Sequence, residues 1–482
     1  MQTVTREQIE AALKRMGLGS GDIVLLHSSV ASLGQVDGGA ETIIQAFLNV
    51  LGPEGTLVVP TFGALGTITE VLRQRPDAVR SLHPKASVAA VGGAAEALCR
   101  DHWKAELAHG PDTPYQRLAD MGGYVCLLGV DQDRNTTLHT AEELLRLPYL
   151  KPTPEVTFDT PGGPVTRIWP FFPGPHRDFI GLDRALRDAG KVRVSRLGNA
   201  VVRLMKSAEL IDACVALGQR DPAFVLCDNP ACADCVAQRA ALRRARYAAE
   251  SFRLAASSSL AGRYPDEIAD TCLATGIDTL ELDGLRGLPL SRLPARDLAA
   301  AVGRLREQKI TLCGLRLTGV GEAFETALDA AVDLDLKRLV LPLTDRACLY
   351  AEKALARNVH LSFANHAAMS SVVADILMGL RSRGLQAELT FSPAEFAIVG
   401  ENPFLTSYRR HLRRFIDQVD LEDCLFDGTP RELARGHAEI REIVSILRCG
   451  SFAGLMVLSP RNRGVGGLPE AAAAFDRLLE TL

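Results

Sequence analysis

The chain has 482 residues, of which 47% are hydrophobic and 23% charged, and its formal net charge is −4. This length predicts two or three domains, and the composition is typical of a globular protein in water. The small negative charge argues against a surface that coats nucleic acid, and the lack of any run of about 18 apolar residues argues against a membrane span.

The N-terminal stretch MQTVTREQIEAALKRMGL (1–18) predicts an amphipathic helix, because it lacks the apolar core and small residues of a signal peptide. Most of the eleven cysteines stand singly in apolar runs, as Cys126, Cys313 and Cys424 do, which is typical of buried free thiols. Free thiols persist in a reducing compartment, so we expect a cytoplasmic protein. The net charge and the absence of a long apolar run lead us to expect no nucleic acid and no membrane among its partners.

Strand-like and helix-like segments alternate through the first half of the chain. Apolar runs predict strands at 22–29, 55–62 and 122–130, and helical patterns predict helices at 40–52 and 87–101. Residues 153–171 are rich in Thr, Pro and Gly, which predicts short strands and turns. This alternation is typical of a layered α/β domain, which we assign to residues 1–226.

The segment HSSVASLGQVDGG (27–39) links the first predicted strand to the helix that follows it. Gly34, Gly38 and Gly39 let a ligand approach the backbone closely, and the start of the helix offers free amides and a positive dipole end. A phosphate or a pantetheine arm fits such a turn. The alternative is that these glycines serve only the conformation of the chain.

The segment NTTLHTAEE (135–143) follows the third predicted strand and places His139 in the first turn of a helix. A carboxylate three residues on lies on the same helical face, so Glu142 can orient the His139 ring for work as a general base. Alternatively, Asn135 or Thr136 caps the helix, and Glu142 and Glu143 only complement its dipole.

Five motifs stand in order along this half: HSSVASLGQVDGG (27–39), LGPEGTLVVPTF (51–62), RSLHPKASVAAVGG (80–93), HGPDTPYQRLADMGGYVCLLGV (109–130) and NTTLHTAEE (135–143). The series resembles the antibiotic acetyltransferase family typified by the aminoglycoside 3-N-acetyltransferases, over about residues 5–227. The later segments DFIGLDRAL (178–186) and DPAFVLC (221–227) extend the resemblance. It implies an N-acetyltransferase with acetyl-CoA as donor and a small-molecule amine as acceptor.

The resemblance also implies roles for particular residues. His139 matches the histidine taken as general base, with Glu142 as its acidic partner, and the acetyl group passes directly from coenzyme A to the amine. The HSS turn and the HP-x-x-S motif are implied to line the coenzyme channel through His27, Ser28, Ser29, Ser32, Leu33, Gly34, Val36, His83 and Ser87.

One segment departs from the family pattern. Members often carry a longer, acidic segment before the HP motif, whereas residues 62–84 here are short and hold few carboxylates. A polycationic aminoglycoside needs several acidic contacts. The acceptor is therefore expected to be either an aminoglycoside or a smaller amine, such as an amino sugar from a biosynthetic route.

A cysteine cluster and a linker helix occupy residues 227–250. Cys227, Cys232 and Cys235 have the spacing C-x4-C-x2-C, which predicts a structural zinc site whose fourth ligand is Cys214 or a histidine. A metal-free loop is the alternative. The basic helix that follows, at 236–250, presents arginines that form either a solvated face or an interaction patch.

Eight apolar runs, separated by segments of helical length, predict a (β/α)₈ TIM barrel over residues 251–482, with an open doubly wound sheet as the alternative. The runs lie at 252–257, 277–283, 310–317, 337–343, 359–365, 386–392, 421–427 and 454–459.

This half resembles the xylose isomerase-like sugar-phosphate isomerase and epimerase barrels. Several positions that hold metal ligands or catalytic groups in such barrels differ here, at Ala364, Cys424, Phe426 and Ser459. The remaining polar residues, Glu281, His366, Glu395 and Asp427, line a pocket at most and do not make a metal set. The loop RNRGVGG (461–467) is either a phosphate site or a plain surface loop.

Three functions follow from these patterns. The first is an acetyl-CoA-dependent N-acetyltransferase fused to a non-catalytic barrel that binds substrate, covers the site or holds a homo-oligomer together. The second is a bifunctional enzyme whose barrel isomerises or epimerises a sugar. The third is a scaffold or binding protein in which both sites are vestigial.

Overall fold

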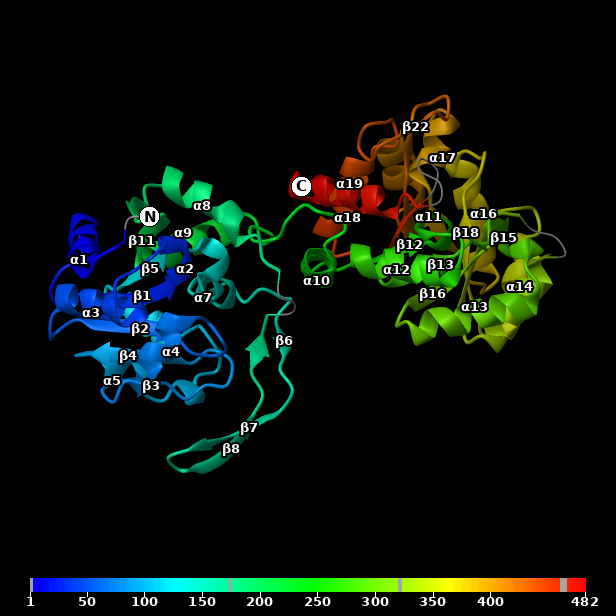
Figure 1. The fold of residues 1–482 in the computed structure, drawn as a ribbon. Coiled ribbons are helices and arrows are strands. Elements are labelled where there is room, and N and C mark those ends of the chain that lie inside the picture. The colour runs from blue at the N-terminus through cyan, green and yellow to red at the C-terminus, as the bar shows by residue number, and fades with distance from the viewer. Residues whose placement is uncertain (1–2, 173–175, 320–322, 460–465) are drawn as a thin grey trace. The chain divides into compact units, whose positions relative to one another are not determined.

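The computed structural model describes residues 3–172, 176–319, 323–459 and 466–482. The chain forms two compact units, Met1–Gln238 and Arg239–Leu482, and helix α10 (Ala233–Ala248) begins in the first and ends in the second (Figure 1). The cysteine segment 227–235 therefore belongs to the first unit. Of the helices in the described ranges, none is long and apolar enough to cross a bilayer.

A seven-stranded mixed sheet forms the centre of the first unit. The strand order is β10-β11-β5-β1-β2-β4-β3, and β1 pairs in parallel with both β5 and β2 while the outer pairs are antiparallel. The strands are β1 (Ile23–Ser28), β2 (Thr56–Pro60), β3 (Val79–Arg80), β4 (Val88–Gly92), β5 (Tyr124–Leu128), β10 (Arg193–Leu197) and β11 (Ala200–Lys206).

Helices cover both faces of this sheet (Figure 1). Successive strand residues point to opposite faces, so Val24 and Leu26 pack with α1 and α3, whereas Ile23 and Leu25 pack with α5 and α6. The helices of the unit are α1 (Arg6–Arg15), α2 (Val30–Leu33), α3 (Gly39–Leu51), α4 (Thr67–Arg73), α5 (Ala95–Cys99), α6 (Pro114–Asp120), α7 (Leu138–Leu144), α8 (Phe179–Asp188) and α9 (Ser207–Arg220), with 3₁₀ turns at His102–Lys104 and Gln132–Arg134.

The single helix predicted for residues 87–101 is wrong. Residues 88–91 form most of strand β4 and are buried within the sheet, and Gly92 and Gly93 turn the chain into the short helix α5. Periodicity cannot distinguish a short, fully buried strand from a buried helical segment, and this ambiguity explains the wrong prediction.

Short strands follow α7, as the sequence between 153 and 171 predicts. They are β6 (Lys151–Pro152), β7 (Val156–Thr160), β8 (Gly163–Arg167) and β9 (Pro170–Phe171). The β7–β8 hairpin extends away from the central sheet (Figure 1). The chain returns through β9 to α8, and this return segment brings Phe172, Arg177 and Phe179 to the same region as α7.

The second unit contains a closed barrel of eight parallel strands, which confirms the predicted barrel and excludes the open sheet. The strands are β12 (Arg253–Ser257), β13 (Thr279–Leu282), β16 (Thr311–Arg316), β17 (Arg338–Pro342), β18 (His360–Ala364), β19 (Glu388–Phe391), β20 (Ile416–Leu421) and β23 (Leu455–Leu458).

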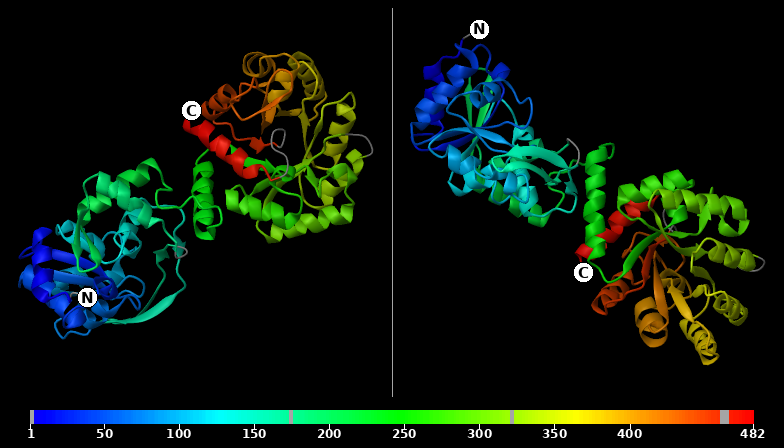
Figure 2. Two further views of the ribbon diagram at one scale, coloured as in Figure 1. Left: turned by 45° about the horizontal axis from the view of Figure 1, so that its top comes forward. Right: turned by 90° about the horizontal axis from the view of Figure 1, so that it is seen from below.

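Helices between the strands lie on the outside of this barrel (Figure 2). They are α11 (Ser258–Ala261), α12 (Pro265–Thr275), α13 (Ala295–Glu307), α14 (Ala323–Asp333), α15 (Ala347–Ala356), α16 (Ser370–Ser382), α17 (Pro393–Ile398), a π-helix at Pro403–Leu412, α18 (Ile440–Cys449) and α19 (Leu468–Glu480). A 3₁₀ turn (Leu290–Arg292) and the small ladders β14–β15 (Gly284–Leu285 with Leu288–Pro289) and β21–β22 (Asp423–Cys424 with Pro430–Arg431) complete the unit.

The seventh barrel strand is not the predicted segment 421–427 but β20, whose sequence IDQVDL begins five residues earlier. Two polar residues of β20, Gln418 and Asp420, point into the barrel and are hydrogen-bonded there, so the strand lacks the apolar run that marks the others. After Leu421, the predicted segment instead forms the short strand β21 and a loop held by Asp423, whose carboxylate accepts four backbone amides.

Candidate active site

A cavity of about 730 Å³ opens where the carboxyl ends of β1, β2 and β5 meet. The chain passes from β1 to β2 on one side and returns to β5 on the other, so the turns after β1 and β5 separate and leave a crevice. His27, Ser28 and Ser29 line the cavity from the first turn, and Asp131 and His139 line it from the second.

His139 and Glu142 form a close pair on α7. His139 Nδ1 lies 2.6 Å from Glu142 Oε2, the His139 side chain is 23% exposed to the cavity side, and the Glu142 side chain is fully buried. The second carboxylate oxygen, Oε1, accepts the Tyr149 hydroxyl at 3.0 Å and Arg177 Nε at 2.8 Å. The spacing of three residues thus brings the two side chains together, as the sequence predicts.

The environment of Glu142 keeps it ionised. Burial alone raises the pKa of this carboxyl, but the hydrogen bond with His139 and the charge of Arg177 outweigh burial and hold the pKa below its usual range. A carboxylate on Nδ1 fixes the His139 tautomer with its proton on that nitrogen. Nε2 is then the nitrogen that can take a proton from a molecule in the cavity.

Aromatic rings hold the His139 imidazole in place. Phe172 stacks on it with ring centroids 4.5 Å apart, and Phe179 meets it edge-on at 5.2 Å. The His109 ring lies 5.2 Å away and forms a second histidine–carboxylate pair, with Nδ1 3.3 Å from Glu143 Oε1. The two adjacent glutamates of α7 therefore serve two histidines.

The capping interpretation of NTTLHTAEE accounts for only part of this geometry. Thr137 occupies the N-cap position of α7 without a side-chain cap bond, and Asn135 Oδ1 accepts the Thr137 amide at 3.2 Å. Asn135 therefore shapes the turn before the helix. It does not explain why His139 and Glu142 meet.

The HSS turn holds seven of the nine residues predicted to line a coenzyme channel. His27, Ser28 and Ser29 line the cavity, and His27 is buried with Nε2 unpartnered among the described residues. Burial lowers the pKa of His27 to about 3, so its ring is neutral. The residues beyond Ala31, namely Ser32, Leu33, Gly34 and Val36, are not among those that line this cavity, and Leu33 belongs to the hydrophobic core, so their coenzyme role stays a prediction.

His83 and Ser87 also lie outside the cavity lining. His83 stacks on His102 and meets Trp169 at a tilt, with ring centroids 4.6 Å apart in each case, and burial lowers its pKa to about 2. Ser87 bonds Thr61 Oγ1 at 3.1 Å and accepts Arg80 Nη2 at 3.2 Å. Lys85 is the residue of the HP-x-x-S motif that reaches the cavity, so a coenzyme role for His83 and Ser87 stays a prediction.

Gly129 lets the HSS turn pack against the end of β5. Its φ is +69°, and a Cβ there would lie 1.8 Å from Ser32 Oγ, which now donates to Ser29 O at 2.7 Å. We expect Gly129→Ala to lower the free energy of unfolding by about 2 kcal/mol, because Ser32 must release Ser29. With acetyl-CoA as the donor that the family resemblance implies, we also expect the KM for acetyl-CoA to rise. Denaturant unfolding and initial-rate kinetics measure both effects.

Gly122→Ala is the matched control for Gly129→Ala. Gly122 has φ +71°, and a Cβ there meets nothing within 4 Å. This variant carries the same backbone strain without the clash, so its KM for acetyl-CoA should equal that of the wild type. Equal KM values for both variants would contradict a role of the packed turn in coenzyme binding.

Glu142→Gln tests the carboxylate on Nδ1. Loss of a hydrogen bond to a charged group costs about 1.5–3 kcal/mol, so we expect kcat to fall about 10- to 100-fold with little change in KM. Because the pKa of Glu142 is lower in the folded protein than in the unfolded chain, its ionised form stabilises the fold at a pH above the unfolded-state pKa. This stabilisation is lost as the pH falls through the folded-state pKa. Thermal unfolding against pH should therefore show a smaller acid-induced loss in the variant than in the wild type. Glu96→Gln, on an exposed position of α5, should change neither kcat nor this loss.

A cluster of three cysteines and one histidine lies in the same unit. All eleven cysteines fall within the described ranges, and none of them forms a disulfide bond. The side-chain ligand atoms of His176, Cys227, Cys232 and Cys235 all lie within 4.8 Å of one another, and His176 Nδ1 is 3.1 Å from Cys235 Sγ. The fourth member is His176, not Cys214, which is a buried residue of helix α9.

The four polar residues singled out in the barrel do not meet in one site. Glu281 is buried inside the barrel and bonded to Arg316 and Gln418, whereas His366 pairs with Glu395 at 2.9 Å on an exposed edge. Asp427 is exposed and accepts the Thr429 amide. The candidate phosphate loop at 461–467 falls almost entirely outside the described residues.

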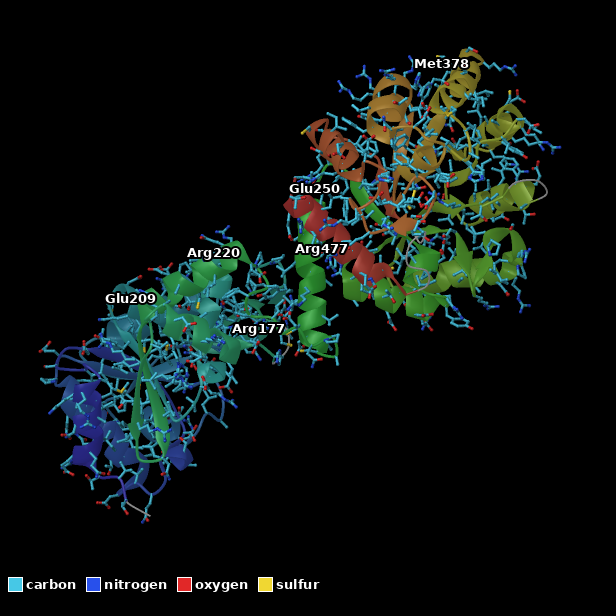
Figure 3. The ribbon with its side chains drawn as sticks, turned by 90° about the horizontal axis from the view of Figure 1, so that it is seen from above. Arg177, Glu209, Arg220, Glu250, Met378 and Arg477 are labelled. Carbon is cyan, nitrogen blue, oxygen red and sulfur yellow. The ribbon has the colours of Figure 1, made fainter. Side chains whose placement is uncertain are left out.

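Sequence patterns missed three residues that contact the His139–Glu142 pair of the candidate site. Tyr149 and Arg177 hold Glu142, and Phe172 stacks on His139, but each comes from a separate segment with no motif spacing to α7. Figure 3 labels Arg177, which comes from the segment between β9 and α8. The one signal available was the dipeptide His176-Arg177 beside the DFIGLDRAL segment.

Comparison with known proteins identifies the family. A sequence profile described as aminoglycoside 3-N-acetyltransferase matches residues 25–65 and 63–218. Aminoglycoside N(3)-acetyltransferase VIII of Streptomyces fradiae is 32% identical over 262 residues, covering 43% of this chain and 89% of that protein. Aminoglycoside N(3)-acetyltransferase VII of Streptomyces paromomycinus is 39% identical over 181 residues, covering 30% of this chain and 62% of that protein, so the chain spans less than two thirds of this relative.

A solved structure, that of aminoglycoside acetyltransferase AAC(3)-IVa, matches 49% of this chain and 96% of its own, with 28% sequence identity and a TM-score of 0.45. Family assignment rests on the profile and on the Streptomyces fradiae relative, which is matched over most of its length. The chain belongs to the aminoglycoside 3-N-acetyltransferase family, a family of acyltransferases.

Proposed function

We propose that the first unit transfers the acetyl group of acetyl-CoA to an amine of an aminoglycoside or a related amino sugar, with His139 as the general base. The observation that carries the proposal is the His139–Glu142 pair at 2.6 Å on the wall of the 730 Å³ cavity. Family membership supports the reaction class, since the named relatives are aminoglycoside N(3)-acetyltransferases.

The proposed chemistry needs one proton acceptor. The amine loses a proton to His139 Nε2 as its nitrogen attacks the thioester carbonyl, and the imidazolium is stabilised through Nδ1–H by Glu142. The C–S bond then breaks, and the coenzyme thiolate takes up the proton. The acetyl group passes directly between the two substrates, with no acetyl-enzyme.

The cavity has groups suited to the coenzyme. Ser28 and Ser29 offer hydroxyls beside the start of a helical turn, and Lys85 and Arg134 add positive charge for phosphate groups. His27 lines the same space, and its buried Nε2 has no hydrogen-bond partner among the described residues. A volume of about 730 Å³ is within the range of small-molecule sites and suits the reacting end of acetyl-CoA beside an amine.

The cavity lining specifies the acceptor amine less closely than it specifies the coenzyme. Of the described residues that line the cavity, only Asp131 and Asp133 are acidic, and Asp131 already pairs with Arg203 at 2.5 Å. Because the cavity lining has few acidic residues, it favours an acceptor that places few positive charges in the cavity. Thiol release from acetyl-CoA, measured against a panel of aminoglycosides and simple amino sugars, tests the proposal. Turnover with none of them would refute it.

We propose that the barrel is not a metal-dependent isomerase, although its sequence resembles such barrels. Two carboxylates inside it, Glu281 and Asp420, are both bonded to the guanidinium of Arg316 rather than left for a cation. The alternative bifunctional enzyme would interconvert aldo and keto sugars when Mn²⁺ or Mg²⁺ is added to the full chain. Such turnover, retained in a His139→Ala variant, would establish that alternative.

We propose that His176, Cys227, Cys232 and Cys235 hold a structural zinc ion. Zinc binds thiolate sulfur at about 2.3 Å and imidazole nitrogen at about 2.0–2.1 Å, so tetrahedral ligand atoms lie about 3.3–3.8 Å apart. The four ligand atoms here are already within 4.8 Å of one another, and a Cys₃His set has no open position for catalysis. Zinc would supply a cross-link between two loops.

A further inference from the structure

One short segment contacts both the cysteine cluster and the His139–Glu142 pair. His176 is a member of the cluster, and its neighbour Arg177 bonds Glu142. We propose that the zinc site is a positioning device for acetyl transfer, which fixes Arg177 on Glu142 and through Glu142 orients the His139 ring. This inference rests on the zinc site and the general base proposed above.

The Arg177–Glu142 contact is buried and specific. Arg177 Nε donates to Glu142 Oε1 at 2.8 Å, and the two side chains are 4% and 0% exposed. The guanidinium lies over the rings of Tyr149 and Phe172, at 5.4 Å from each centroid. A charge pair so far from water interacts strongly, so Glu142 takes the position that Arg177 sets.

The cysteine loop anchors the segment that carries Arg177. His176 O accepts Arg177 Nη1 at 2.7 Å, which ties the guanidinium to the backbone of a zinc ligand. The His176 amide donates to Asp234 Oδ2 at 3.3 Å, and the Asp178 amide donates to Val225 O at 2.9 Å. These contacts lead from residues 176–178 to residues 225–235, so the cross-link provided by zinc holds one segment against the other.

The consequence concerns the chemical step more than coenzyme binding. Without the metal cross-link, residues 176–178 lose their anchor, Arg177 leaves Glu142, and the carboxylate no longer has a fixed place beside His139 Nδ1. The contacts named above for residues 176–178 go to Glu142, Asp234 and Val225, and none of them goes to the HSS turn, which follows β1 and lines the same cavity. Loss of zinc is therefore expected to lower kcat and leave the KM for acetyl-CoA unchanged.

A double-mutant cycle in the full chain tests the inference. Cys232→Ser removes a partly exposed ligand, Arg177→Ala removes the positioning residue, and Cys449→Ser is the control at an exposed cysteine of the second unit. We expect Cys232→Ser to lose zinc in elemental analysis and to lower kcat about 10- to 100-fold, and Arg177→Ala to keep zinc with a similar loss. The double variant should be no slower than either single one, because both act on the same contact. If Arg177→Ala fails to fold, Arg177→Lys takes its place.

Additive losses in the double variant, or full kcat in a zinc-free Cys232→Ser, would refute the inference. A wild-type protein without zinc whose cysteines all react with a thiol reagent would refute the zinc site itself, and the inference with it. Hydrogen–deuterium exchange of residues 138–144, with and without a zinc chelator, needs no substrate and separates these results from a failure of the acetyltransferase proposal. We expect faster exchange after chelation, and unchanged exchange contradicts the inference even if no acceptor amine is found.

Discussion

Replacing His139 with alanine is expected to lower kcat for acetyl transfer by about 10²- to 10⁴-fold, while the KM for acetyl-CoA stays within about threefold of the wild-type value. The expectation follows from the position of the ring, whose Nδ1 is held by Glu142 and whose side chain lines the cavity. Initial rates of thiol release over a range of acetyl-CoA and amine concentrations give both constants.

His366→Ala is the matched control for this substitution. His366 is 71% exposed in the second unit and pairs with Glu395, so its loss should leave kcat unchanged. Added imidazole should restore part of the activity of His139→Ala, because the deleted ring leaves room between Phe172 and His109. A kcat within threefold of wild type, with an unaltered pH profile, would show that another group takes the proton.

Local periodicity predicted the fold where each element carries its own signal. Strands β1 and β5 are short apolar runs that end in polar turns, and α3 has an apolar stripe closed by Gly52. The pattern failed at β4, where the buried run resembles a helix, and at β20, where interior polar residues hide the strand. In both cases the deciding information is the neighbouring strand, which lies far away in sequence.

The candidate site likewise has local contacts that the sequence could predict and long-range contacts that it could not. The His139–Glu142 contact follows from a spacing of three residues on one helix, and sequence alone could predict it. Arg177 reaches Glu142 from 35 residues away, and His176 reaches Cys235 from 59 residues away. Contacts of this kind depend on how β9 returns to α8, and no local pattern encodes that path. The ordered family motifs located the site, but not the residues that support it.

A buried ion network fills the barrel interior. Arg316 Nη1 and Nη2 donate to both carboxylate oxygens of Asp420, at 2.9 and 2.6 Å, and Nε donates to Glu281. Gln418 Nε2 bridges the same two carboxylates. Burial alone lowers the pKa of Arg316, but the two carboxylates outweigh burial and hold it above its ordinary value. The guanidinium therefore stays charged at any working pH.

Arg316→Met is expected to destabilise the barrel by about 3–5 kcal/mol, because it leaves Glu281 and Asp420 buried without a counter-charge. Both tryptophans, Trp103 and Trp169, belong to the first unit, so tryptophan fluorescence follows that unit and far-UV circular dichroism follows both. Denaturant unfolding should show a barrel transition shifted to lower denaturant in the circular dichroism signal. The transition detected by tryptophan fluorescence should not move.

A rescue variant separates lost charge from lost packing in Arg316→Met. Adding Glu281→Gln and Asp420→Asn should recover most of the stability, since neutral amides bury at lower cost. Arg304→Met, at a side chain 52% exposed and paired with Asp266, should cost about 1 kcal/mol or less. A loss for Arg316→Met as small as that of Arg304→Met would show that the interior network does not stabilise the barrel.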